Sequence, residues 1–368
     1  MREKLTPFRT KLNRLTFWIP KILNMSAWRA LFHHDMQACF LTIFYLILVN
    51  ETKALSYDFL WKILMLVASL ALYIVYMFLV NDYFDMPTDR IAGKKTEIHD
   101  MPKALIVGLL ILITFLSWGV AILLVGQTLY VLIYATAYFL STFYSAPPLR
   151  FKCRGLLGTI YAAFLEKPIP AVLIFSFFQH FNMDTLILLS FFFFWNLEGI
   201  IHHQYLDYEG DLKAQVKTFA VEIGQGKTEK ILDYLQPLLT VFSFVVYFLL
   251  FRDIPYSTVF LIFMVVGLIL VHKLKRSRAS VRDKSVLPSR FYVEDPVTHP
   301  YYAFIDVCLQ WPLPLFVGLI STLRFAPYIL VLLLTIASQY YFVKGYYRPV
   351  LRGALSLFQK FHSTKSGN

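Results

Sequence analysis

Long apolar runs alternate with short polar connections along most of the chain. Leu60–Val80 is representative, because its roughly 20 residues carry almost no charge and are long enough to cross a bilayer as a helix. The same pattern predicts ten membrane spans: Met36–Val49 with its neighbours, Trp61–Asn81, Ala104–Val125, Leu129–Ser145, Leu156–Phe178, Thr185–Leu206, Ile231–Phe251, Ser257–His272, Tyr302–Ser321 and Phe325–Phe342. The connections are too short for a separate soluble domain, so the sequence predicts an all-α, polytopic membrane helical bundle.

Basic segments flank this bundle. Residues 1–35 carry many Lys and Arg side chains interleaved with Phe17, Trp18 and Ile19, and they contain neither a continuous apolar core nor a small-residue cleavage site. We therefore expect an amphipathic helix on the cytoplasmic leaflet rather than a removable signal peptide. A disordered basic tail is the alternative. Residues 36–345 form the predicted transmembrane domain, and residues 346–368 form a basic cytoplasmic tail.

Composition supports a membrane protein and argues against several other classes. Of the 368 residues, 58% are hydrophobic and only 16% are charged, which is too apolar for an ordinary soluble domain. Cys39, Cys153 and Cys308 are far apart and lack metal-ligand spacing, so neither a disulfide framework nor a zinc site is indicated. The net charge of +12 falls in short loops between apolar runs, which is the positive-inside pattern rather than a nucleic-acid-binding surface.

A polar cluster at the end of the second predicted span carries the first candidate chemistry. If the helix continues, Asn81, Asp85 and Asp89 lie on one face, and Asp82 lies one step around it. Carboxylates this close repel one another, and desolvating them at a membrane border is costly. A divalent cation relieves both costs, and oxygen ligands suit Mg²⁺, which favours phosphate oxygens as its remaining ligands. A solvated acidic helix end is the simpler alternative.

A second acidic cluster ends the sixth predicted span. Asp207 and Asp211 are again four residues apart, and Gln204 and His203 lie one turn earlier on nearly the same face. Lysines follow both clusters closely, so together the clusters predict a cage for a metal-bridged diphosphate. The second, fourth, sixth and eighth spans end in segments with far more Lys and Arg than the opposite loops. We therefore expect an integral, multi-pass membrane protein with its N-terminus and both acidic clusters on the cytoplasmic side.

These motifs resemble those of a known family. N-D-x-x-D-x-x-x-D at Asn81–Asp89 and D-x-x-x-D at Asp207–Asp211 are similar to the paired signatures of the UbiA superfamily of intramembrane prenyltransferases. Tyr144–Lys152 and Asp211–Gly224 also resemble the family's segments after its fourth helix and after its second motif. The resemblance covers Leu60–Gly224 well. It implies a UbiA-like core of nine helices, from which the tenth predicted span departs.

The resemblance also implies a site in which Mg²⁺ assists the departure of diphosphate from a prenyl donor. The metal ligands it implies are Asn81, Asp85, Asp89, Asp207 and Asp211. Asp82 would either bind the metal ion directly or orient the neighbouring ligands. Basic residues that could grip the diphosphate are Lys94, Lys95, Arg150, Lys152 and Lys217, although ordinary loop charge also explains each of them. Tyr144 would contact the diphosphate or the forming carbocation, and an interfacial anchor is its alternative role.

Several polar residues lie inside predicted spans, where ionisable groups indicate function by default. Glu198, His203 and Gln204 lie on or near the face that bears Asp207, so they are candidates to bind or deprotonate an acceptor. Further candidates are Glu166, Lys167, His202, Asp306 and Gln310, with a neutralising pair as the alternative for Glu166 and Lys167 and a later start of the ninth helix as the alternative for Asp306. The run His33–Asp35, before the first span, is a weaker candidate of the same kind.

The leading interpretation is a Mg²⁺-dependent prenyltransferase that moves an isoprenoid chain from its diphosphate to a hydrophobic acceptor within the membrane. A terpene cyclase would use the same site without an acceptor. A cation-coupled transporter is a third interpretation, disfavoured because the acidic groups cluster at one membrane face, and an obligate structural subunit would not need two acidic clusters. Expected partners are therefore prenyl diphosphate, a hydrophobic acceptor and membrane lipid, with no nucleic acid.

Two segments depart from the family pattern. Ile91–Asp100 lacks the Arg-Pro pair common after the first motif, which is unlike the quinone, haem and chlorophyll branches. Ser277–His299 is a longer basic stretch than the family's usual link, and the sequence assigns it no role.

Overall fold

The computed structural model describes residues 17–23, 25–32, 34–50, 56–125, 127–279 and 304–340. Within them the chain is helical, with one isolated bridge between Gly155 and Thr218 and no strand. The named elements are α2 (Ser26–Arg29), η1 (Ala30–Phe32), α3 (His34–Val49), α5 (Tyr57–Ala92), η2 (Glu97–Asp100), α6 (Lys103–Val125), α7 (Thr128–Ser145), η3 (Phe151–Cys153), α8 (Gly155–Glu166), α9 (Pro168–Phe178), α10 (Met183–Leu206), α11 (Tyr208–Lys213), α12 (Phe219–Ile223), α13 (Gln225–Phe251), α14 (Ser257–Ala279), the π-helical η4 (Ile305–Gln310), α16 (Pro312–Arg324), η5 (Ala326–Tyr328) and α17 (Ile329–Ser338). The predicted all-α bundle is confirmed.

Helices overlap every predicted span, but they differ in length. Among the described residues, five helices are long and apolar enough to cross a membrane: Tyr57–Ala92, Lys103–Leu123, Gly155–Phe178, Met183–Leu206 and Gln225–Phe251. Shorter apolar helices are Asp35–Val49, Ser257–Leu270 and Ala326–Ser338. The ends of the ninth and tenth predicted spans, most of Ser277–His299 and the basic tail lie outside the described residues.

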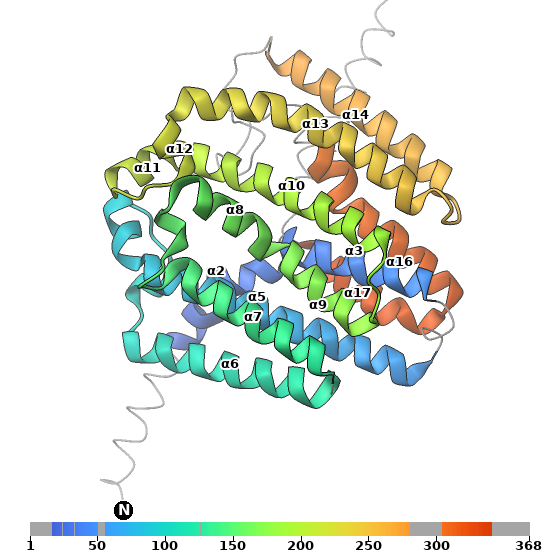
Figure 1. The fold of residues 1–368 in the computed structure, drawn as a ribbon, viewed down its shortest axis with the longest axis horizontal. Coiled ribbons are helices and arrows are strands. Elements are labelled where there is room, and N and C mark those ends of the chain that lie inside the picture. Colours follow the sequence, from blue (N-terminus) through green and yellow to red (C-terminus); the bar gives the residue numbers. More distant parts are fainter. Residues whose placement is uncertain are drawn as a thin grey trace, which may run out of the picture.

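The helices pack side by side in one bundle (Figure 1). α5 packs against α6 and α7, α10 against α8 and α13, and α3 against α9 and α16. α6 forms one edge of the bundle and α14 the other. The shared core is rich in aromatic residues, and its largest fully buried side chains include Tyr73, Tyr134, Phe44, Phe175 and Phe192.

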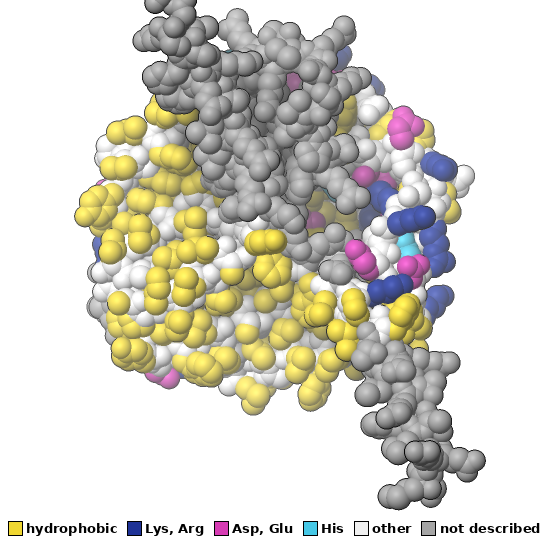
Figure 2. Space-filling model, turned by 180° about the vertical axis from the view of Figure 1, so that it is seen from behind, with side chains coloured by type: hydrophobic (Ala, Val, Ile, Leu, Met, Phe, Trp, Pro, Cys, Tyr) yellow, Lys and Arg dark blue, Asp and Glu magenta, His cyan; other side chains and the backbone are white. Residues whose placement is uncertain are grey.

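Apolar side chains also cover the outside of the bundle. Phe115 and Leu123 on α6 are 74% and 87% exposed, and Val259 on α14 is 65% exposed. Figure 2 shows a broad apolar face, with charged side chains gathered along one edge of it. Hydrocarbon solvates such a surface, whereas water does not, so the bundle is that of an integral membrane protein.

α5 is much longer than the predicted second span, because it continues through the acidic motif. Its 36 residues extend for about 54 Å, well beyond a hydrocarbon core of about 30 Å. The helix ends at Gly93, whose left-handed backbone (φ 81°) lets its N–H reach the Arg90 carbonyl. Asn81, Asp85 and Asp89 therefore lie on one helical face, as the sequence predicts.

The predicted fifth span is not one helix but two, α8 and α9, which meet at Lys167. Pro168 has no N–H to continue the helix, and near this break the Asn196 Nδ2 of α10 donates to the Ala162 and Ala163 carbonyls of α8 at 3.2 and 3.3 Å. Asn196 Oδ1 accepts from Lys167 Nζ at 2.6 Å. Lys167 Nζ also lies 4.0 Å from Asp35 Oδ1 of α3, so a carboxylate of another helix is an ionic partner of this lysine. The Asn196 amide thus contacts both the end of α8 and the buried Lys167 ammonium.

We expect Asn196→Leu to lower the free energy of unfolding by roughly 2–4 kcal/mol, because it leaves two carbonyls and the Lys167 ammonium without this amide. Thermal unfolding of the detergent-solubilised protein measures the change. Thr136→Val is the matched control, because the exposed Thr136 hydroxyl only donates to Leu132 within its own helix. Equal melting temperatures for the two variants would remove Asn196 from this role.

Candidate active site

The first acidic motif lies in the last turns of α5. Asp85 is 2% exposed, its Oδ2 accepts a hydrogen bond from Lys152 Nζ, and Arg150 Nη2 lies 3.9 Å from its Oδ1. Asn81 Oδ1 accepts from Ser145 Oγ at 2.7 Å. The segment that follows α7 thus lies against the motif and neutralises a carboxylate that would be costly to bury alone.

Backbone geometry brings both cations to Asp85. α7 ends at Ser145, and Arg150 adopts a left-handed conformation (φ 35°) immediately before η3. Lys152, in η3, then faces the motif. Burial alone would lower the pKa of Lys152, but the charge of Asp85, its hydrogen bond and the charges of Tyr144 and Asp89 together outweigh burial and raise that pKa, so Lys152 stays protonated.

The remaining carboxylates of this motif differ in their surroundings. Asp82 Oδ2 accepts a hydrogen bond from Ser26 Oγ of α2, so this side chain contacts the N-terminal segment. Met25 and Ala27 are buried beside Ser26 in a small core that also contains Met86 of α5. Asp89 lies one turn beyond Asp85 and is half-buried.

The second acidic motif lies where α10 ends. Asp207 caps α10, and its Oδ2 accepts from Lys94 Nζ at 2.6 Å and lies 3.2 Å from His203 Nε2. Lys94 follows α5 directly, so this ion pair connects the two motifs. Asp211 lies on α11, the short helix that continues from Asp207.

Close packing holds the two motifs together. α11 packs against α5, and a Cβ built on Gly210 would lie 3.4 Å from the Ala92 side chain, so the two helices approach closely at this glycine. On the other side, Gly155 N–H donates to the Lys217 carbonyl at 2.9 Å, which ties the segment after α11 to the start of α8.

The two carboxylates of the second motif have pKa values shifted in opposite directions. Burial alone would raise the pKa of Asp207, but the hydrogen bond from His203 and the charges of His203 and Lys94 together hold it well below its usual range. Burial and the charge of Asp207 raise the pKa of Asp211. Asp207 is therefore the firmly ionised member of the pair.

The predicted acceptor residues have other partners. Glu198 is buried and accepts from Gln236 of α13 at 2.8 Å. Gln204 joins three helices, because its Nε2 donates to Thr159 of α8 at 3.0 Å and its Oε1 accepts from Ala220 N–H of α12. His203 contacts Asp207. All three lie on α10, and none of these contacts identifies an acceptor.

Tyr144 belongs to an aromatic stack beside Lys152. Its ring is nearly parallel to that of Tyr161, with centroids 6.1 Å apart, and the Phe151 ring stacks on Tyr161 with centroids 4.3 Å apart. The resemblance singled out Tyr144, but the sequence did not single out Tyr161 or Phe151 among 35 Phe and 23 Tyr.

Other predicted residues lie farther from the acidic groups. Lys217 is exposed, and Lys95 lines a separate cavity next to the end of α5. Asp35 is buried near Lys167 and Gln310 is buried in the bundle. His202 is buried on α10. His33 and the side chains of His34 and Asp306 lie outside the described residues.

Sequence reasoning missed Ser145 and Ser26. Ser145 stands directly beside Tyr144 in the segment that resembles the family, so that segment offered a signal for it. Nothing local marks Ser26, which is separated from Asp82 by 56 residues of chain.

The candidate metal ligands at this end of the bundle suit a hard divalent cation, because they offer carboxylate oxygens and the amide oxygen of Asn81. Asp85 Oδ1 is buried and has no hydrogen-bond partner among the described residues. In that part of the chain no three Asp, Glu, His or Cys side chains stand close enough to hold a metal ion. The carboxylates are instead paired with Lys152 and Lys94, so metal ligation stays a prediction.

The fold defines a polytopic helical membrane protein in which acidic and basic side chains meet at one end of the bundle. A family model described as the UbiA prenyltransferase family matches residues 39–294, and the chain belongs to this family. The predicted resemblance is confirmed, and it extends beyond Leu60–Gly224 in both directions. No match was found among curated protein sequences.

Solved structures of similar fold include a UbiA homolog from Archaeoglobus fulgidus bound to DMAPP and Mg²⁺, which is 19% identical with a TM-score of 0.50 over 85% of this chain and 99% of that chain. The same homolog bound to GPP and Mg²⁺ is 18% identical with a TM-score of 0.48 over the same shares. A structure of digeranylgeranylglyceryl phosphate synthase in membranes is 15% identical, with a TM-score of 0.46 over 87% of this chain and 99% of that chain. At these identities the similarity is one of fold.

We expect Asp207→Asn to lower the free energy of unfolding at pH 7 by on the order of 1 kcal/mol, because its ion pair with Lys94 is lost. The pKa of Asp207 is depressed in the folded protein, so its stabilising contribution is present above about pH 4 and is lost as the pH falls further. Thermal unfolding without magnesium, at pH 7 and near pH 3, measures both effects.

Asp58→Asn is the control for this prediction, because the Asp58–Lys62 pair is exposed and contributes little. A difference between Asp207→Asn and the wild type that is the same at both pH values would contradict the assigned ionisation.

Proposed function

We propose that this protein is a Mg²⁺-dependent prenyltransferase that transfers an isoprenoid chain from a prenyl diphosphate to a hydrophobic acceptor within the membrane. Membership of the UbiA prenyltransferase family supports the reaction class. The observation that carries the proposal is the Lys94–Asp207 ion pair, which joins the end of the first acidic motif to the second. A UbiA homolog of this fold is bound to DMAPP and Mg²⁺, which supports the same classes of ligand here.

Interleaved charges suit a diphosphate with its counterion. Asp85 and Asp207 are each paired with a lysine, so these two carboxylates are already neutralised without a ligand. Diphosphate oxygens can take over the two lysines while the metal ion takes over the carboxylates. Each buried charge then exchanges one partner for another, and none is left uncompensated.

The proposed metal ligands remain Asn81, Asp85, Asp89, Asp207 and Asp211. A bound Mg²⁺ supplies Lewis-acid stabilisation of the leaving diphosphate. Among the basic candidates, Lys94, Arg150 and Lys152 are the proposed diphosphate contacts, because they lie within reach of the motif carboxylates. They hold negative oxygens as fixed, charge-assisted donors.

The aromatic stack gives Tyr144 a role in the transfer itself. The C–O bond of the donor breaks with its electron pair on the diphosphate, a new bond joins the allylic carbon to the acceptor, and the acceptor loses a proton to the diphosphate product. The faces of Tyr144, Tyr161 and Phe151 stabilise positive charge on the allylic carbon and exclude water from it. We infer that this chemistry lies on the cytoplasmic side, because the basic loops cluster there.

Pyrophosphate release by the purified protein tests the reaction class. With allylic diphosphates of several lengths, we expect release that requires both Mg²⁺ and a membrane lipid extract as the source of acceptor, and that stops with EDTA. Metal-dependent release with a cyclic product and no added lipid would favour a cyclase that uses the same site. No release under any of these conditions would overturn the proposal.

Variants of the charged groups test the site. We expect Asp85→Asn to reduce pyrophosphate release by more than about 100-fold, because it removes a proposed metal ligand at nearly constant shape. Lys152→Ala should weaken donor binding by about tenfold or more through the loss of a charged hydrogen bond. Asp58→Asn and Lys62→Ala, an exposed pair on α5 remote from the motif, are the controls. Activity of Asp85→Asn equal to that of its control would exclude Asp85 from the site.

A further inference from the structure

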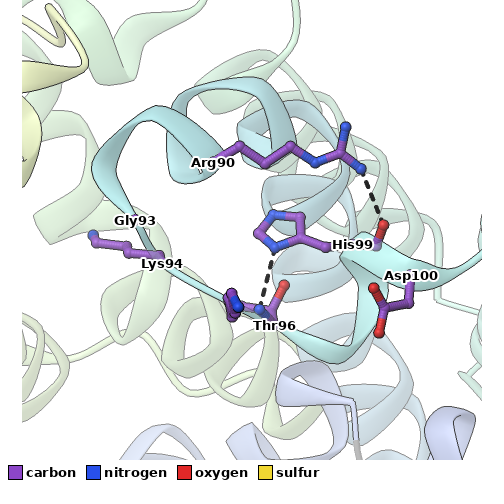
Figure 3. Close-up of a pocket in the computed structure, with 7 residues that line it drawn as sticks. Arg90, Gly93, Lys94, Thr96, His99 and Asp100 are labelled. Carbon is purple, nitrogen blue, oxygen red and sulfur yellow. Dashed lines mark hydrogen bonds between the residues drawn. The ribbon is translucent and has the colours of Figure 1, made fainter.

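A cavity of about 360 Å³ lies beside the acidic motifs, between the end of α5 and η2. Its lining is Arg90, Gly93, Lys94, Lys95, Thr96, His99 and Asp100 (Figure 3). None of the motif aspartates lines it. The volume falls within the range of small-molecule sites in proteins.

The lining carries an excess of positive charge. Arg90, Lys94 and Lys95 are cationic, whereas Asp100 is the single carboxylate and already lies 3.2 Å from Lys21 Nζ. Arg90 Nη2 donates to the His99 carbonyl at 3.0 Å, which fixes the guanidinium at the rim and leaves its other N–H donors for a ligand. The electrostatic preference of the cavity is therefore for an anion.

His99 adds a donor with no partner. Its Nδ1 accepts a hydrogen bond from the Thr96 backbone N–H at 3.2 Å, so in the neutral ring the proton lies on Nε2. That Nε2 is buried and has no hydrogen-bond partner among the described residues. Figure 3 shows the imidazole inside the loop, between Arg90 and Thr96. A buried donor costs free energy unless an acceptor reaches it, and a phosphate oxygen is such an acceptor.

The cavity also lies beside the start of α6, a helix with an apolar, exposed outer face. Ile98 of η2 is buried in the small core that includes Met86 and Ile106, and α6 begins only three residues after η2. The outer face of α6 is apolar and exposed at Ile111, Leu112 and Phe115, as a lipid-facing helix requires. A lipid whose acyl chains lie along α6 can place its phosphate in the cavity.

We propose that this cavity binds the phosphate head group of an anionic membrane lipid with a phosphomonoester, at a position separate from the prenyl diphosphate. Arg90, Lys95 and the His99 Nε2–H donate to the phosphate oxygens. Lys94 lies at the boundary of the cavity, beside Asp207, and is assigned to the prenyl diphosphate rather than to the lipid. The inference goes beyond the proposed transferase reaction and does not depend on it.

Titration of the detergent-solubilised full chain with dioctanoyl phosphatidic acid, followed by native mass spectrometry, tests the proposal. Dioctanoyl phosphatidylcholine and inorganic phosphate are the comparison ligands. The titration with inorganic phosphate distinguishes a site for a lipid head group from a site for free phosphate. We expect one tight phosphatidic acid molecule, bound at least about fivefold more tightly than either comparison ligand.

Arg90→Gln and His99→Leu should each lower the affinity for phosphatidic acid by about tenfold and leave that for phosphatidylcholine unchanged. Lys227→Gln is the matched control, because Lys227 is an exposed cation in the first turn of α13 and does not line the cavity. Unchanged lipid affinity in both variants, equal binding of phosphatidylcholine, or equal binding of inorganic phosphate would overturn the proposal. So would stoichiometric displacement of the lipid by Mg²⁺ and pyrophosphate, which would make the cavity part of the donor site.

Discussion

The constraint on which this structure depends is the cost of burying carboxylates at the border of a membrane. Asp85 is almost completely buried, and an isolated charge there would be strongly destabilising. Lys152 and Arg150 remove that cost, and to do so the segment after α7 must lie directly against α5. At the second motif Lys94 and His203 do the same for Asp207. Apolar packing makes α5, α7 and α10 neighbours. Charge neutralisation then determines which of their side chains face one another at this end of the bundle.

The same pairing explains how a site rich in charge can remain stable without a ligand and still accept a polyanion. A site that held only carboxylates would need its metal ion in order to fold, and a site that held only lysines would repel that metal ion. Here the two kinds of group neutralise each other, and a diphosphate with its counterion carries the complementary pair of charges. Binding then replaces lysine–carboxylate contacts with lysine–phosphate and carboxylate–metal contacts, so the number of compensated charges is conserved.

Much of this arrangement could be predicted from the sequence because it follows from local periodicity. Apolar length predicts the helices, and a spacing of four residues places Asn81, Asp85 and Asp89 on one face whatever the rest of the chain does. Contacts between distant segments could not be predicted in the same way. Ser26 meets Asp82 only because α2 packs under α5, and Gln204 proves to link α8, α10 and α12 although its position suggested an acceptor. A polar side chain in an apolar run indicates that some partner exists without identifying it, as Asn196 and its helix break also illustrate.

Basic loop residues are the clearest case in which one sequence signal has several structural meanings. The positive-inside pattern accounts for their number but not for their roles, since any lysine on that side satisfies it. The structure divides them by their surroundings. Lys94 and Lys152 contact buried carboxylates, Arg90 and Lys95 line a cavity without motif aspartates, and Lys217 is exposed while its backbone anchors α8. A cation that compensates a buried carboxylate can be transferred to a phosphate ligand, whereas a cation at the rim of an anion-sized cavity can bind a second phosphate independently. Two phosphate sites can therefore be distinguished at this end of the bundle. In one, the lysines that bind phosphate are paired with buried carboxylates when no ligand is bound, and in the other the cations have no such partner among the described residues.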